Sequence, residues 1–179
     1  MIVSIEAALI HYNEKEYTKY IDEHIRNVQK AWENIKSNFM AMEYIKNTAT
    51  NYSPFLIDTI DELVKNHDAS KYSEFEFDAY RRNFYPISPE EKENNKEDFE
   101  KAWKHHYMNN LHHCQYWYNK NDMDAMPFPY IIEMICDWEA MSYKFGGTSK
   151  EWYENNKGDI HLGNKQKEIV ESLLNIICK

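Results

Sequence analysis

YTKYIDEHIRNVQKAWENIKSNFMAM, residues Tyr17 to Met42, is the stretch that decides the fold. Its apolar and aromatic side chains recur at a helical spacing, at Tyr17, Ile21, Val28, Ile35, Phe39 and Met42. This spacing places them on one face of an α-helix, and His24 falls on the same face between Ile21 and Val28. The stretch therefore predicts a long helix that buries an apolar stripe with a histidine in it.

The composition favours an all-α fold. Glycine (4) and proline (5) are rare, and no segment alternates β-branched and polar residues as strands do. A length of 179 residues is typical of one domain and is long enough to bury a core without disulfides. We therefore expect a single helical domain over 1–179, with its functional core at about 17–146 and a C-terminal helical extension over 148–179.

A second apolar stripe also leads directly into a histidine, and it consists of Leu56, Ile60, Leu63 and His67. Ser53-Pro54 has the residues of a helix start, with serine as the cap and proline in the first turn. The sequence therefore predicts two separate helices that each carry a histidine on the buried face.

Other signals outline the remaining helices. Ser73-x-x-Glu76 and Thr148-x-x-Glu151 are capping-box patterns, and Ser88-Pro89 resembles another helix start. The highly charged run at 91–98 is expected to form a mobile loop. The most apolar helix should span about 130–145 and end at Gly146-Gly147, and an amphipathic helix should span about 165–178.

Charge and cysteine content limit the partners and the compartment. A net charge of −9 argues against binding along a nucleic-acid backbone. The three cysteines (Cys114, Cys136 and Cys178) form no disulfide framework, which fits a reducing cytoplasm. We see no signal peptide and no apolar run near the roughly 18 residues of a membrane span, so we expect a cytoplasmic protein without a membrane partner.

Four residues have the character of metal ligands. Asp137 lies between Cys136 and Trp138 in the most apolar helix, where a carboxylate without a cationic partner is costly to bury. His24 lies within one apolar stripe and His67 lies at the end of the other. A single histidine in such a position is more often a core residue that bonds to a backbone carbonyl. With the adjacent Asp68 they would form a mixed nitrogen and oxygen set that suits Mn, Fe, Zn, Co or Mg.

Further residues suggest a second divalent ion and a phosphate. His106, with His112 or His113, would hold the second ion. The cations that could bind a phosphate are Lys71, Arg81, Arg82 and Lys144. Arg81 and Arg82 have an alternative role, because they could instead pair with acidic residues of their own helix.

The ordered set His24, His67-Asp68 and Asp137 resembles the HD-domain superfamily of metal-dependent phosphohydrolases. This resemblance implies an HD-like helical bundle and a metal-activated water that attacks a nucleotide or another small phosphoester. His67-Asp68-x-x-Lys71 resembles the variant found in members with two or three metals, which carry extra histidines between the pair and the last aspartate. Asp68 and Lys71 would then be catalytic. Lys71 replaces the acid of the nucleotidase branch, so nucleoside monophosphates are a less obvious substrate.

Longer strings are similar to a family of small uncharacterised proteins from bacteria and their phages. These strings are HDASKYS (67–73), YRRNFYP (80–86), NLHH (110–113) and CDWEAMSYKFG (136–146). The similarity implies a phage or prophage origin, and hence the cytoplasm of a host, but it brings no activity.

Two other functions are compatible with the same residues. The protein could be a phage-encoded module that binds a nucleotide or a host protein, with a structural metal or none. It could also be an HD-type di-iron oxygenase, since related folds use the same ligands. A homo-oligomer is a further expectation, because the last helix offers an apolar face made of Leu173, Leu174, Ile176 and Ile177.

Overall fold

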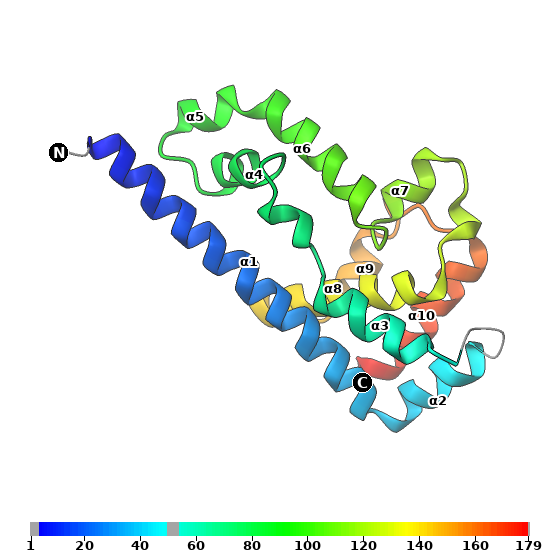
Figure 1. Cartoon of the computed structure of the whole chain (residues 1–179). Coiled ribbons are helices and arrows are strands. Elements are labelled where there is room, and N and C mark those ends of the chain that lie inside the picture. Colours follow the sequence, from blue (N-terminus) through cyan, green and yellow to red (C-terminus); the bar gives the residue numbers. More distant parts are fainter. Residues whose placement is uncertain (1–3, 50–53, 179) are drawn as a thin grey trace. The chain divides into compact units, whose positions relative to one another are not determined.

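The computed structural model describes residues 4–49 and 54–178, and within them the chain is helical and contains no strand (Figure 1). The predicted all-α class is confirmed. The α-helices are α1 (Ile5–Ser37), α2 (Phe39–Thr48), α3 (Leu56–Lys65), α4 (Phe77–Phe84), α5 (Pro89–Asn94), α6 (Lys96–Asn109), α7 (Cys114–Asn119), α8 (Phe128–Phe145), α9 (Ser149–Asn156) and α10 (Asn164–Ile177). Two short 3-10 helices, η1 (Ala69–Tyr72) and η2 (Met123–Ala125), complete the list.

The chain divides into two compact units. The first unit contains the chain up to Glu23 and Asp68–Asn110, and the second contains His24–His67 and the chain from Leu111 onward. The chain therefore passes between the units within α1, at the His67–Asp68 bond and after Asn110. The single domain expected over 1–179, with a core at about 17–146, stays a prediction.

Aromatic rings hold the first unit together. Tyr17 of α1 packs against Phe77 and Tyr85, with ring centroids 5.2 and 5.9 Å apart. Tyr80 of α4 meets Phe99 of α6 edge-on, with centroids 5.1 Å apart. Such pairs stabilise a small core beyond the area they bury.

Two sequence predictions in the first unit are wrong. The charged run at 91–98 is helical rather than a mobile loop, because the Ser88 side chain caps α5 by accepting the backbone N–H of Glu91. The Ser73–Glu76 capping box does not form, and α4 begins at Phe77 without a side-chain cap. The Glu76 carboxylate instead bonds to histidines of α6.

Helix α8 lies at the centre of the second unit. Ile131, Ile132 and Ile135 are fully buried on it, and α3, α9 and α10 all pack against it. The predicted stripe of α1 joins the same core through Val28 and Ile35. Burial along two sides of α8 explains why this helix is the most apolar in the chain.

The ends of several helices follow the sequence signals, with one exception. The predicted capping box at Thr148 and Glu151 is present at the start of α9, and Gly146 ends α8 with a φ of 83°, which favours glycine. The stripe predicted to continue through Phe39 is interrupted, because Asn38 caps a new helix and leaves Phe39 74% exposed. The predicted cap Ser53 lies outside the described residues.

The apolar face of α10 is used within the second unit. Leu173 and Leu174 are buried in its core, and Ile176 and Ile177 pack against that core. None of the helices in the described ranges has both the length and the hydropathy needed to cross a bilayer.

Replacing Ile135 by alanine tests the central position of α8. Ile135 is fully buried, so Ile135→Ala should lower the free energy of unfolding by about 2–5 kcal/mol. Ile5→Ala is the matched control, because Ile5 is 82% exposed and its loss should change stability by less than about 0.5 kcal/mol. Urea unfolding followed by circular dichroism measures both, and equal effects would contradict this account of the core.

Candidate metal centre

The His67–Asp68 pair divides between the two units, with His67 in the second unit and Asp68 in the first. Helix α3 ends at Lys65, and Asp68 adopts a left-handed conformation with a φ of 54° before η1 begins. Aspartate is one of the few residues that tolerate this conformation. His67 and Asp68 are 1% and 2% exposed, so neither is a surface turn residue.

Five side chains form what we call the second-unit cluster, namely His24, His67, His112, Glu133 and Asp137. His24 comes from α1, His67 follows α3, and His112 lies in the loop before α7. Glu133 and Asp137 are four residues apart on α8 and therefore share one face of that helix. All are buried except Asp137, which keeps 17% of its side chain exposed.

Glu133 orients two of these imidazoles at once. Its Oε1 atom lies 3.0 Å from Nδ1 of His67 and 3.2 Å from Nδ1 of His112. An ionised carboxylate can only accept, so the bonded Nδ1 of His67 carries the hydrogen. In a neutral imidazole with this tautomer the Nε2 atom is the one that can bind a metal.

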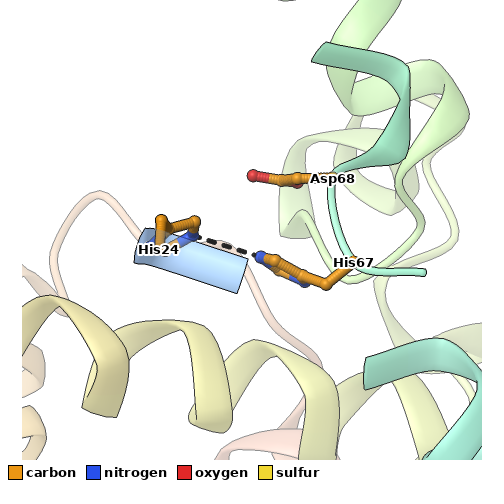
Figure 2. Close-up of side chains that lie close together, drawn as sticks. All are labelled: His24, His67 and Asp68. Carbon is orange, nitrogen blue, oxygen red and sulfur yellow. Dashed lines mark hydrogen bonds between the residues drawn. The ribbon is translucent and has the colours of Figure 1, made fainter. Parts of the chain in front are cut away.

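The Nε2 atoms meet around Asp137. Its Oδ1 atom lies 3.1 Å from Nε2 of His24 and 3.9 Å from Nε2 of His67, and Oδ2 lies 3.9 Å from Nε2 of His112. Nε2 of His24 is 3.3 Å from Nε2 of His67, and Figure 2 shows these two imidazoles facing each other. Lone pairs and a carboxylate arranged in this way repel one another unless a proton or a cation lies among them.

These spacings suit a divalent ion. With metal–ligand bonds of about 2.1 Å, neighbouring ligand atoms lie about 3.0 Å apart in an octahedron and about 3.4 Å apart in a tetrahedron. Two of the four distances fall in that range, and the others exceed it by about half an ångström. The buried histidine and carboxylate groups of the second unit could therefore hold a metal ion.

The carboxylates of the second-unit cluster favour the ionised form. Burial alone would raise the pKa of Glu133, but His112 and His67 outweigh it and hold that pKa at about 2. Burial likewise opposes ionisation of Asp137, yet the hydrogen bond from His24 and the nearby His67 and His112 hold its pKa well below the usual range. Both groups thus present negative charge to the imidazoles.

A similar arrangement, which we call the first-unit cluster, contains Asp68, Lys71, Glu76, His105 and His106. Glu76 is fully buried and accepts from Nδ1 of His105 at 2.7 Å and from Nδ1 of His106 at 2.8 Å. Nε2 of His106 lies 3.2 Å from Oδ1 of Asp68, and Lys71 donates to Oδ2 of Asp68 at 2.6 Å. Burial alone would lower the pKa of His106, but Asp68 and Glu76 raise it.

The remaining predicted site residues lie elsewhere in the two units. Arg81 is buried and pairs with Glu91 and Asp78, and Arg82 pairs with Asp78 and Asp98. This is the ion-pair role that the sequence left open for both arginines. Lys144 is exposed near the end of α8. His113 is half-buried beside His112, with ring centroids 4.2 Å apart.

Sequence reasoning missed Glu133 and misread Glu76. Glu133 precedes Asp137 by four residues inside an apolar helix, so the burial argument that pointed to Asp137 applies to it equally. Glu76 fits a capping-box pattern in the sequence. The structure shows that its carboxylate instead accepts hydrogen bonds from His105 and His106 of α6. His112, which the sequence places with His106 around a second ion, lies 3.2 Å from Glu133 and 3.9 Å from Asp137.

The chain belongs to a family of unknown function (DUF5662), whose model matches residues 13–179. The matched range includes every residue of both clusters. No curated protein and no solved structure matches the chain.

Acid titration tests the position of Glu133. Its folded pKa of about 2 lies below the ordinary glutamate value of 4.5, so the stabilisation is present above about pH 4.5 and is lost as the pH falls toward 2. In chelator-treated protein, Glu133→Gln should remove on the order of 3 kcal/mol of stability that the wild type gains between pH 2 and 5. Glu62→Gln, on a side chain that is 66% exposed, is the control. Equal pH slopes in wild type and Glu133→Gln would contradict the structure.

Proposed function

We propose that the protein is a metal-dependent phosphohydrolase of the HD type, acting on a nucleotide or another small phosphoester. The observation that carries the proposal is the second-unit cluster, where Glu133 holds two imidazoles with their Nε2 atoms directed at Asp137. Four protein ligands would fill a tetrahedral site, but they would leave two positions of an octahedral ion open for water and a phosphoryl oxygen.

His24, His67, His112 and Asp137 would be the ligands of one divalent ion. Such an ion lowers the pKa of water and polarises a phosphoryl oxygen, which is the chemistry that phosphoester hydrolysis needs. Glu133 would act through His67 and His112 by fixing their tautomer and ring orientation. The exposed part of Asp137 would leave this ligand accessible from solvent.

The first-unit cluster supplies groups suited to the substrate. Lys71 carries a positive charge, is 14% exposed at its side chain and is fixed by its bond to Asp68. A lysine held in this way can bind a phosphoryl oxygen and stabilise the negative charge that builds up during the reaction.

Elemental analysis combined with phosphate release tests this function. The protein as purified should contain a divalent metal and release inorganic phosphate from small phosphoesters. His67→Ala and Asp137→Ala should lose both the metal and the activity, since each removes a proposed ligand. His11→Ala is the control, because its side chain is 67% exposed and lies outside both clusters. A metal-free wild type, or alanine variants that keep the metal, would rule the proposal out.

The orienting role of Glu133 gives a separate prediction. Glu133→Gln keeps the size of the side chain but cannot accept from both imidazoles with the same strength, so metal affinity should fall about 10–100-fold. Competition with a fluorescent chelator measures the affinity. Glu62→Gln should leave it unchanged, because that side chain is exposed on α3. An unaltered affinity in Glu133→Gln would show that the carboxylate does not support the ligands.

A further inference from the structure

Two tyrosine hydroxyls of the first unit are buried without a hydrogen-bond partner among the described residues. Tyr17 of α1 is 1% exposed and Tyr80 of α4 is 5% exposed. Leaving a buried hydroxyl unbonded costs about 1–3 kcal/mol, so folded proteins usually avoid it. Tyr153 in the second unit shows the usual arrangement, because its hydroxyl donates to Glu171 at 3.3 Å.

The rings of both tyrosines are fixed by apolar contacts that do not involve their hydroxyls. Tyr17 packs between Phe77 and Tyr85, and Tyr80 packs edge-on against Phe99. Phenylalanine could make the same contacts at both positions. The packing of the first unit therefore gives no reason for either hydroxyl.

Polar side chains of the same unit lie near the Tyr80 ring. Nζ of Lys71 lies 5.8 Å from the centre of the Tyr80 ring, and the His106 ring lies 5.7 Å from it. Burial, followed by the charges of nearby groups that include Asp68 and Glu76, raises the pKa of both tyrosines. Both hydroxyls thus keep their proton and are available as donors.

We propose that Tyr17 and Tyr80 are substrate-binding residues whose hydroxyls donate hydrogen bonds to the phosphoryl oxygens of a phosphoester held beside Lys71. This inference rests on the proposed function and adds two residues to its substrate site. A phosphoryl group offers several acceptor oxygens, so it can satisfy two donors and a lysine together. Asp68 and Glu76 do not oppose this binding strongly, because each is already paired with a cationic or donating side chain.

Conversion of each tyrosine to phenylalanine separates a binding role from a structural one. Inorganic phosphate is titrated calorimetrically into the metal-containing wild type, Tyr17→Phe and Tyr80→Phe, and the melting temperature of each ligand-free protein is recorded. We expect each variant to bind phosphate about tenfold more weakly, since one hydrogen bond to a charged group is lost. The ligand-free melting temperature should stay the same or rise, because an unbonded buried hydroxyl has been removed.

Tyr153→Phe is the matched control. It removes a buried hydroxyl that has a partner, so it should lower the melting temperature and leave phosphate affinity unchanged. If Tyr17→Phe and Tyr80→Phe bind phosphate as the wild type does, the inference is wrong. The proposed function survives that result when the wild type still releases phosphate from phosphoesters. A wild type that neither binds phosphate nor releases it overturns both.

Discussion

The Oε1 atom of Glu133 accepts a hydrogen bond from Nδ1 of His67 and lies 3.2 Å from Nδ1 of His112, and the geometry of the second-unit cluster depends on this carboxylate. The apolar residues of α8 bury Glu133, so its charge has no water to stabilise it and relies on His67 and His112. The Glu133 carboxylate also fixes the tautomer of those imidazoles and directs their Nε2 atoms toward Asp137. Removal of the carboxylate would therefore disturb four side chains rather than one.

The same arrangement, a histidine placed between a glutamate and an aspartate, occurs once in each of the two compact units. In the first, Glu76 accepts from Nδ1 of His106, whose Nε2 faces Asp68. In the second, Glu133 accepts from Nδ1 of His67, whose Nε2 faces Asp137. Histidines that bind metals usually donate their other ring N–H to such a carboxylate. The left-handed backbone at Asp68 lets consecutive residues serve these two arrangements.

The helical stripes of the sequence were sufficient to predict the fold class and to find His24 and His67, because burial on a helix follows directly from spacing. Asp137 was predicted because a carboxylate in an apolar helix is costly to bury without a cationic partner. Glu133 and Glu76 were not predicted as site residues, because a glutamate side chain is long enough to reach solvent or a helix terminus from most positions. The pairing of Arg81 with Glu91 was also hidden, because it depends on how α4 and α5 pack and not on the i, i+4 spacing within α4.

The buried polar groups of this protein are difficult to explain by stability alone. Apolar side chains of similar volume often stabilise a core as well as buried ion pairs do, because taking charges out of water is costly. Here two carboxylates and three imidazoles lie together in the second unit, and two phenol hydroxyls in the first lack a partner within the described ranges. The two unbonded hydroxyls cost free energy in the ligand-free protein. A ligand that binds only the folded chain would recover that cost, since it stabilises the native state in proportion to its affinity. The metal ion proposed for the second unit and the phosphoester proposed for the first would be ligands of this kind.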